Sequence, residues 1–327
     1  MSSRKVVVVT GGAGFVGSHL IDALVENYDV LCIDNYVTGN PENLANAFKK
    51  AEAYGTKLVC AVFDVSSDQL VSEICRMMSV HFGSRQVWAY ANLACPASPV
   101  AYQADPIATL DTCYKGTMNA MQFAKMGARV LHASTSEVYG DPEVHPQRET
   151  YKGSVNTWGP RACYDEGKRV AETICYEHLV KGYDVRVVRI FNSFGTRMHV
   201  DDGRVLTNFI RQTMKNEDVT VYGNGSQTRS MCYVSDTVKG LQAVLETNIR
   251  VCEPINIGNP CEITILDLAK KVLEMFPNSG SKIVFRDLPT DDPTRRCPDI
   301  SKAKSLGWTP EISLEEGLKM MIDEFVL

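Results

Sequence analysis

Three features that would narrow the class of protein are scarce or missing in this sequence. The N-terminal apolar run, Val6–Val9, is too short for a signal sequence or a membrane span. No dense basic block occurs, and 34 Lys and Arg face 39 Asp and Glu for a net charge of -5, so the electrostatic footprint of a nucleic-acid-binding protein is missing. The 11 cysteines are scattered, odd in number and without a CxxC pair, which is typical of a reducing compartment. We therefore expect a cytoplasmic protein with no nucleic-acid, membrane or metal partner.

Short β-branched runs alternate with helix-length segments through the first two thirds of the chain. The runs are continuously apolar, as in strands buried on both faces of a parallel sheet. This alternation predicts an α/β fold, a Rossmann doubly wound parallel sheet with a smaller mixed α/β substrate-binding lobe. The predicted strands are Lys5–Val9, Val30–Asp34, Lys57–Asp64, Gln86–Leu93, Ala128–Ser134 and Val185–Phe191.

The alternation of strand-like runs and helix-length segments ends after Asn192, where loops rich in Gly and Asp separate shorter elements. With 327 residues, of which 44% are hydrophobic, the chain is long enough to divide its core between two lobes. We expect residues 1–192 to form the nucleotide domain and residues 193–229 and 258–327 the substrate lobe. The helical segment Tyr233–Leu245 indicates that residues 230–257 return to the nucleotide domain.

The first predicted strand runs into a glycine-rich turn. Gly12, Gly14 and Gly17 form G-x-G-x-x-G, and Gly11 begins an overlapping G-x-x-G-x-x-G. Such glycines allow a tight turn and a close approach of backbone to a pyrophosphate, which then faces the positive end of the following helix. The motif is weak alone, but the preceding strand and the following helical pattern favour a dinucleotide site.

Asp34 ends the next strand, seventeen residues after Gly17, close to the spacing expected for a ribose-binding carboxylate. Its charge would repel a 2′-phosphate, and no Arg or Lys stands in the Asn35–Gly39 segment that follows, so NAD is favoured over NADP. Asp64 and Val65 follow the third strand. A contact with the adenine and an ordinary strand end are equal alternatives for this pair.

Tyr164 and Lys168 lie four residues apart at the start of a predicted helix, so both face one side of it. An enzyme that oxidises a hydroxyl group needs a base, and an ammonium and a nicotinamide cation near Tyr164 would lower its pKa toward that role. A surface Tyr–Lys pair is the alternative, which the upstream glycine motif disfavours. The segment Ser134–Glu137 ends a strand and is expected to point into the ligand cleft.

Eight segments resemble those of UDP-glucuronate decarboxylases (UDP-xylose synthases), which are extended short-chain dehydrogenases/reductases. The resemblance covers nearly the whole chain in consistent order and is more specific than any single motif. Many members carry an N-terminal membrane anchor, which this sequence lacks, so a cytosolic form is expected. The segments are TGGAGFVGSH, LACPASP, ASTSEVYGDP, PRACYDEGKR, RIFNSFGTRM, DDGRV, VYGNGSQTR and RRCPDISKAK.

The resemblance implies NAD-dependent decarboxylation of UDP-glucuronate to UDP-xylose and CO2 through a 4-keto intermediate, with NAD regenerated internally. Tyr164, supported by Lys168 and Thr135, would take the proton from the hydroxyl on carbon 4 while a hydride passes to NAD. The resulting β-keto acid loses CO2, and return of the hydride completes the cycle. Glu137 and Arg296 would orient the ring, handle the carboxylate and help to reprotonate carbon 5.

The resemblance also implies ligand contacts and a homodimer formed through a helix pair near the Tyr164 helix. Arg229 is expected to bind the diphosphate, because a guanidinium group fits phosphate oxygens bidentately. For any one of the contacts in the second lobe, a purely structural role is an equal alternative. The expected substrate-binding residues are Pro96, Ser136, Asn192, Arg204, Tyr222, Gln227, Arg229 and Arg296, and the expected cofactor-binding residues are Gly11, Gly14, Phe15, Val16, Gly17, Asp34, Asn35, Asp64, Val65, Leu93, Ala94, Tyr164 and Lys168.

Four residues differ from those that are usual at the same positions in the resembled family or in related enzymes. Ser136 stands where the related dTDP-glucose 4,6-dehydratases have an acidic Asp, which disfavours dehydration. Cys113 replaces an Asn that commonly supports the active site, and we favour a buried structural thiol over a reactive one. Asn92 stands where His is common, and Cys297 where Lys is common.

Rival interpretations remain on the same scaffold. One is an oxidative decarboxylase that releases UDP-4-keto-pentose and NADH, another an apiose-forming variant, and a third another sugar-nucleotide epimerase or dehydratase. A non-catalytic NAD sensor would bind the cofactor without turnover. The joint presence of Tyr164, Lys168, Thr135, Glu137 and Arg296 argues against the sensor.

Overall fold

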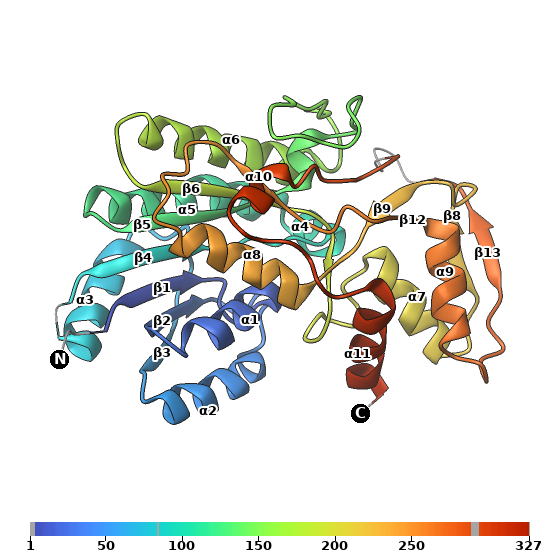
Figure 1. Ribbon diagram of the computed structural model, residues 1–327, viewed down its shortest axis with the longest axis horizontal. Helices are drawn as coiled ribbons and strands as arrows, with labels where there is room; N and C mark the ends of the chain where they lie inside the picture. The colour runs from blue at the N-terminus through green and yellow to red at the C-terminus, as the bar shows by residue number, and fades with distance from the viewer. Residues whose placement is uncertain (1–3, 84, 289–293, 327) are drawn as a thin grey trace.

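The centre of the molecule is a seven-stranded parallel sheet with the strand order β11-β6-β5-β4-β1-β2-β3 (Figure 1). The structure is a computed structural model that describes residues 4–83, 85–288 and 294–326. The chain moves outward from β1 on one side and from β4 on the other, which is the order of a doubly wound Rossmann sheet and confirms the predicted fold class. The strands are β1 (Val6–Thr10), β2 (Asp29–Asp34), β3 (Leu58–Val62), β4 (Val87–Asn92), β5 (Arg129–Thr135), β6 (Val185–Ile190) and β11 (Ile255–Ile257).

All six predicted strands lie in this sheet, with ends that differ by at most two residues. Their side chains alternate between two cores: Val7 and Val9 of β1 face one, and Val6 and Val8 face the other. Burial on both faces explains why the strands read as continuous apolar runs. The first core is covered by α1 (Phe15–Leu24), α2 (Ala45–Tyr54) and α8 (Val234–Glu246), and the second by α3 (Leu70–Phe82), α5 (Pro106–Lys125) and α6 (Ala162–Leu179).

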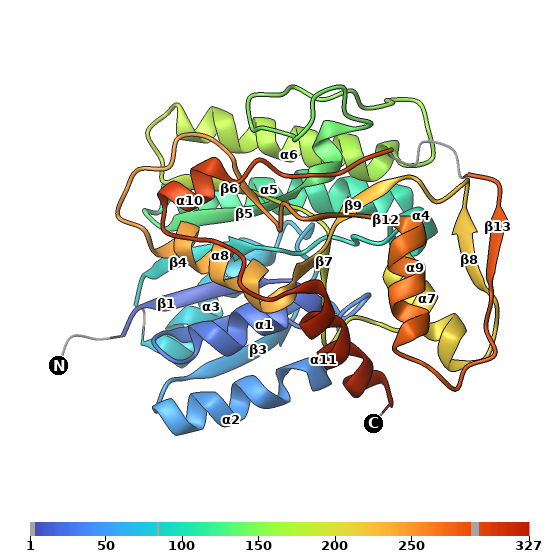
Figure 2. The same cartoon turned by 45° about the vertical axis from the view of Figure 1, so that its right-hand side comes forward.

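The smaller part of the molecule lies beside the carboxyl ends of the strands, at the right in both views (Figures 1 and 2). Its paired strands are β8 with β13 and β9 with β12, while the short strands β7 and β10 pair with each other next to α8. Among the described residues, no helix has both the length and the apolar content that a membrane crossing needs. The remaining elements are β7 (Ser193–Phe194), β8 (Val219–Tyr222), β9 (Thr228–Ser230), β10 (Cys232–Tyr233), β12 (Glu262–Thr264), β13 (Ile283–Arg286), α4 (Pro99–Ala104), α7 (Val205–Met214), α9 (Ile265–Glu274), α10 (Ser301–Ser305), α11 (Leu314–Val326) and the 3-10 turns η1 (Pro41–Leu44) and η2 (Ser136–Tyr139).

Asn256 on the edge strand β11 joins two distant loops to the sheet. Its amide nitrogen donates to the carbonyl oxygens of Gln147 at 2.9 Å and Asp299 at 3.1 Å, and its amide oxygen accepts from the Tyr139 hydroxyl at 2.8 Å. The side chain is fully buried, so water cannot replace these partners. The loop that carries Asp299 also carries Arg296, so this amide helps to place a predicted site residue.

We predict that Asn256→Ala lowers the free energy of unfolding by about 2–4 kcal/mol, because it leaves several buried polar groups without a partner. Urea denaturation followed by circular dichroism measures this change. Asn248→Ala, at an exposed position, is the matched control and should change stability by less than about 0.5 kcal/mol. Equal effects of the two substitutions would contradict the assigned role of Asn256.

Candidate active site

A cavity of about 680 Å³ opens at the carboxyl ends of the central strands. Its wall runs from the turn after β1 past the ends of β2, β4 and β5 to residues of the smaller part. In doubly wound sheets, ligands bind at this point, where the strand order reverses between β1 and β4. The volume is within the range of ordinary ligand pockets.

The turn after β1 leaves no room for side chains at two of its glycines. Gly11 has φ +69°, and a Cβ there would lie 2.7 Å from the backbone nitrogen of Ala94. A Cβ on Gly17 would lie 2.0 Å from the carbonyl oxygen of Gly11. The backbone therefore forms a bare cradle at the start of α1, the arrangement that a pyrophosphate requires.

Asp34 at the end of β2 is held rigidly at the next part of the cavity wall. Its carboxylate accepts from the backbone N–H groups of Ala13 at 2.9 Å and Tyr36 at 2.8 Å, and the side chain of Asn35 donates to Asp64 at 3.1 Å. The two backbone contacts orient the Asp34 carboxylate and leave it able to accept further hydrogen bonds from ribose hydroxyl groups. The bare glycine turn and this acidic strand end together fit a dinucleotide such as NAD.

The structure places nearly all the predicted site residues along this one cavity. The exception among the described residues is Arg296, which is treated below. The residues that line the cavity are Gly11, Gly14, Phe15, Val16, Gly17, Asp34, Asn35, Asp64, Val65, Leu93, Ala94, Pro96, Thr135, Ser136, Glu137, Tyr164, Lys168, Asn192, Arg204, Tyr222, Gln227 and Arg229.

Tyr164 and Lys168 face the cavity from the first turns of α6. The ring of Tyr164 stacks on that of Tyr102, with centroids 5.0 Å apart. Lys168 Nζ donates to the carbonyl oxygen of Ala133 at 2.8 Å and lies 5.9 Å from the centre of the Tyr164 ring. The stacked partner and the anchored ammonium fix the direction of the Tyr164 hydroxyl.

Burial raises the pKa of Tyr164 well above its ordinary value, and the neighbouring Cys95 adds to this effect. A hydrogen bond with Thr135 and the charge of Arg204 act in the opposite direction. The lowered pKa expected from the sequence therefore needs the charge of a nicotinamide ring in addition to Lys168, since these protein groups do not offset the burial.

Glu137 lies between two guanidinium groups. Its Oε2 accepts from Arg161 at 2.6 Å and from Arg296 at 2.9 Å. Burial alone would raise the pKa of Glu137, but the charges of Arg296, Arg161 and Arg229 outweigh it and lower the pKa to about 2. Glu137 is therefore a carboxylate at neutral pH, which suits it to accept hydrogen bonds.

Arg296 contacts Glu137 on the side of the carboxylate that faces away from the cavity. It is 1% exposed, its Nη1 donates to the carbonyl oxygen of Gly140, and it does not line the cavity formed by the described residues. From this position Arg296 contacts Glu137 and not that cavity, so we expect it to position Glu137. Arg161, which is not among the residues predicted from the sequence, lines the cavity and contacts the same carboxylate.

Arg161 and Tyr102 are cavity residues next to Tyr164 and Glu137 that sequence reasoning missed. Arg161 precedes Tyr164 by three residues and caps α6, so helical spacing places it on the same side as Tyr164. That spacing was a usable signal. Tyr102 is buried in α4, and its stacking on Tyr164 depends on how α4 meets α6, for which the sequence carries no local pattern.

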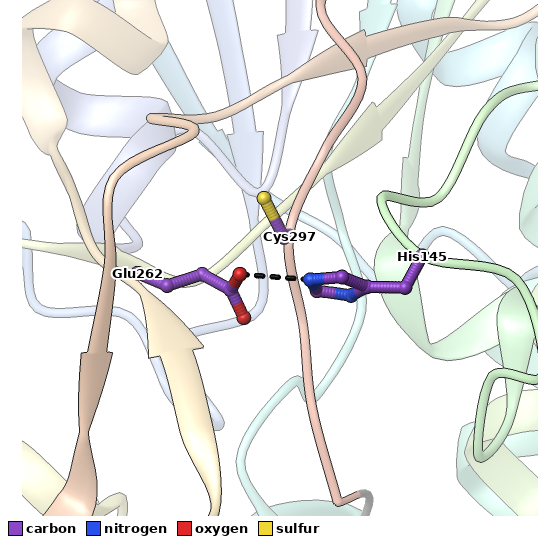
Figure 3. A group of neighbouring side chains, drawn as sticks. All are labelled: His145, Glu262 and Cys297. Atoms are coloured by element: carbon purple, nitrogen blue, oxygen red, sulfur yellow. Dashed lines mark hydrogen bonds and ion pairs between the residues drawn. The ribbon is translucent and has the colours of Figure 1, made fainter.

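The side chains of His145, Glu262 and Cys297, the last of which follows Arg296 in the chain, lie close together (Figure 3). Their candidate ligand atoms lie within 4.8 Å of one another, a spacing that a metal ion would also require. Gln147 indicates a different arrangement. Its Oε1 accepts from the backbone N–H of Cys297 at 2.8 Å, which turns its Nε2 toward His145 Nδ1 at 3.4 Å.

This orientation makes His145 Nδ1 the acceptor and leaves the ring proton on Nε2, which donates to Glu262 at 2.8 Å. A proton then occupies the position from which an imidazole nitrogen would bind a metal. Hydrogen bonding accounts for the group, which joins the chain at Cys297 and strand β12 to the loop that carries His145 and Gln147.

Asn92 and Cys113, which also differ from the residues usual in the resembled family, both make local contacts in the structure. The amide of Asn92 bridges Thr10 Oγ1 at 3.0 Å and His132 Nδ1 at 3.2 Å in the buried sheet. Cys113 is 3% exposed on α5, and its sulfur lies 3.4 Å from that of Cys95.

The fold and the site together define a class of protein. The model of the GDP-mannose 4,6 dehydratase family matches residues 8–321. UDP-glucuronic acid 4-epimerase from Bacillus cereus, solved in complex with UDP-glucuronic acid and NAD, is 26% identical with a TM-score of 0.81, and the match covers 98% of this chain and 99% of that one. These likenesses, with Tyr164 and Lys168 at a dinucleotide cleft, define an extended short-chain dehydrogenase/reductase.

Curated relatives narrow the family. UDP-glucuronic acid decarboxylase 1 of Arabidopsis thaliana is 49% identical over 326 residues, which are 98% of this chain and 70% of the relative. The protein of the same name from Danio rerio is 48% identical over 98% of this chain and 73% of its own length. The chain belongs to the UDP-glucuronic acid decarboxylase family, which confirms the resemblance found in its motifs.

Asp165 follows Tyr164 on α6 and carries a pKa raised to about 7 by burial and by the charge of Glu137. The native state therefore keeps the proton between the ordinary value of 3.8 and about 7, while the unfolded chain loses it. The native state binds more protons in this range, so Asp165 makes the protein less stable as the pH rises through it.

We predict that Asp165→Asn removes this dependence. Its stability relative to the unchanged protein should rise by up to about 1.4 kcal/mol per pH unit across that range. Urea unfolding at a series of pH values measures the difference, with Asp68→Asn at an exposed position as the control. Parallel stability curves for Asp165→Asn and the unchanged protein would show that the proton is not held there.

Proposed function

We propose that this chain decarboxylates UDP-glucuronate to UDP-xylose and CO2 through a 4-keto intermediate, using NAD that is regenerated in each cycle. The observation that carries the proposal is the partly buried Glu137, which is held by Arg161 and Arg296 and faces the same cavity as Tyr164. Relatives at 47–49% identity that are named UDP-glucuronic acid decarboxylase support it.

Bound NAD would lie along Gly11–Gly17 and Asp34, and it supplies the acceptor for a hydride from carbon 4 and the donor that returns it. Tyr164 removes and later returns the proton on the oxygen at carbon 4. Lys168 holds its ammonium beneath the tyrosine and favours the phenolate. Thr135 donates to or accepts from the same oxygen and keeps the hydroxyl group aligned.

Glu137 and Arg161 meet the end of the sugar that carries the carboxylate. Arg161 attracts that carboxylate, while Glu137 accepts hydrogen bonds from ring hydroxyl groups. A second negative charge placed beside Glu137 raises its pKa by Coulombic repulsion, so substrate binding brings Glu137 closer to holding the proton that carbon 5 needs after CO2 leaves. Arg296 keeps Glu137 in place.

The second part of the molecule would bind the nucleotide. In this proposal, residues 193–229 and 258–327 form the sugar-nucleotide lobe, and residues 1–192 with 230–257 form the NAD domain. Arg229 binds the diphosphate, and Asn192, Arg204, Tyr222 and Gln227 surround the nucleotide and sugar, together with Pro96 and Ser136. Their positions along one cavity support this assignment.

We also propose that the protein is a cytoplasmic homodimer. The pair α5 and α6 presents apolar side chains to solvent, among them Ile107 (69% exposed) and Tyr114 on α5, and Val170 and Tyr176 (59% exposed) on α6. A face of this kind on two adjacent helices supports a twofold contact between copies.

The test is to incubate the purified protein with UDP-glucuronate, with and without added NAD, and to follow the sugar nucleotide by proton NMR and NADH by absorbance. We expect UDP-xylose without lasting NADH. A 4-keto pentose with stoichiometric NADH would show an oxidative decarboxylase instead. No consumption by cofactor-loaded protein would overturn the proposal.

Tyr164→Phe should lower the rate by about 10²–10⁴-fold, because it removes the group that transfers the proton. Binding of NADH, followed by its fluorescence, should persist, since the glycine turn is unchanged. Tyr54→Phe, half exposed at the end of α2, is the control for a lost phenolic hydroxyl. Unchanged turnover in Tyr164→Phe would exclude it as the base.

A further inference from the structure

Two cysteine sulfurs are in contact at the wall of the active-site cavity. Cys95 follows β4 and lines the cavity, whereas Cys113 lies beneath it on α5 and is 3% exposed. Their Sγ atoms are 3.4 Å apart. The mechanism proposed above uses neither thiol, and Cys113 stands where an Asn is usual in the resembled family.

The contact lies directly against the catalytic helix. Gly167 sits between Tyr164 and Lys168 on α6, and a Cβ placed there would be 3.1 Å from Cys113 Sγ. Cys95 packs against the apolar cluster that contains Tyr102 and Tyr164. The sulfur pair therefore separates the loop at the end of β4 from the helix that carries the base.

The two thiols differ in acidity. The hydrogen bond with Cys113 lowers the pKa of Cys95 to about 7. The charge of Lys168 also lowers this pKa, whereas burial raises it. The same hydrogen bond and burial raise the pKa of Cys113. The more acidic and more accessible sulfur is the better nucleophile toward an oxidant, and its neighbour is placed to resolve the product.

We propose that Cys95 and Cys113 form a reversible oxidation site, at which a hydroperoxide converts the two thiols into a disulfide that inactivates the enzyme. The inactivation rests on the function proposed above, whereas disulfide formation does not. In a reducing compartment such a bond is transient and regulatory, not structural.

The chemistry balances with the peroxide as the only oxidant. The Cys95 thiolate attacks the peroxide, an S–O bond forms, the O–O bond breaks, and hydroxide leaves and takes up a proton. Cys113 then attacks the sulfenic sulfur of Cys95, the S–S bond forms, the S–O bond breaks, and the oxygen leaves as water with the proton of the Cys113 thiol. Two thiols lose two electrons, and one hydrogen peroxide becomes two waters.

The geometry indicates why the disulfide would inactivate. Sulfur atoms 3.4 Å apart must approach to about 2.05 Å in a disulfide. A contraction of about 1.3 Å draws the cavity loop toward α5, beside the helix that holds Tyr164. Displacement of a reacting group by about 1 Å can lower a rate by about 10²-fold.

The position of Cys95 also predicts when the site is open. Cys95 reaches solvent through the cavity that the dinucleotide and the sugar nucleotide would fill. Bound NAD and UDP would cover its sulfur, so oxidation should proceed faster in the ligand-free enzyme.

The experiment treats the purified protein with limiting hydrogen peroxide, with and without NAD and UDP, blocks the remaining thiols, and maps peptides by mass spectrometry under non-reducing conditions. We expect a linked Cys95–Cys113 peptide pair, formed at least about tenfold more slowly when the ligands are present. The activity on UDP-glucuronate should fall at least about tenfold and recover with dithiothreitol.

Three variants test whether the linked pair is Cys95 and Cys113, and the activity of each oxidised variant is compared with that of its own reduced form. Cys113→Asn should form no linked pair and should regain less activity with dithiothreitol, since a Cys95 sulfenic acid without a resolving thiol is open to further oxidation to the sulfinic acid, which dithiothreitol does not reduce. Cys163→Ser removes another nearby thiol and should behave like the unchanged protein. Cys252→Ser, at an exposed position, controls for oxidation elsewhere.

Linkage of Cys95 to Cys163, or equal behaviour of Cys113→Asn and the unchanged protein, would overturn the pair. Linkage without loss of activity would overturn the inactivation. If the protein does not turn over UDP-glucuronate at all, peptide mapping and protection by NAD still decide whether the oxidation site exists.

Discussion

The carboxylate of Glu137 is the group on which the rest of the site depends. It lies in the turn after β5, Arg161 approaches it from the start of α6, and Arg296 approaches it from the C-terminal segment. Without these cations the partly buried carboxylate would be protonated more readily, because burial disfavours an unpaired charge. The ion pairs therefore join three segments that are remote in sequence, and they give the cavity one end with a fixed negative charge and a fixed positive neighbour.

Support for this cluster extends outward through hydrogen bonds. Gln147 binds the backbone of Cys297, His145 pairs with Glu262, and Asn256 ties the surrounding loops to the edge of the sheet. None of these side chains lines the cavity formed by the described residues. Their contribution is geometric: they restrict the positions open to Arg296, and through it to Glu137, so that little reorganisation is needed when a charged ligand enters.

Much of the fold was predictable because its signals are local. Parallel strands buried on both faces leave continuous apolar runs, and the glycine turn and Asp34 keep a fixed spacing, so six strands and the cofactor end of the cavity could be located from the sequence. The short strand Ile255–Ile257 gives too few residues for a pattern. Contacts between segments that are remote in sequence could not be predicted in this way. Arg296 lies behind Glu137 instead of in the cavity wall, and the approach of Cys113 to Cys95 depends on how α5 meets the end of β4.

The order in which the parts of the site occur along the chain has a consequence for biosynthesis. Everything that lines the dinucleotide end precedes residue 170, whereas Arg296 comes close to the end of the sequence. Domains fold in the order in which the ribosome delivers them. The helix α1 of the dinucleotide cradle shares its core with α8 (Val234–Glu246), so that domain is complete only after α8 has been made. The second cation of Glu137, Arg296, follows fifty residues later along the chain. The dinucleotide cradle and the fully paired Glu137 are thus completed at different points of synthesis.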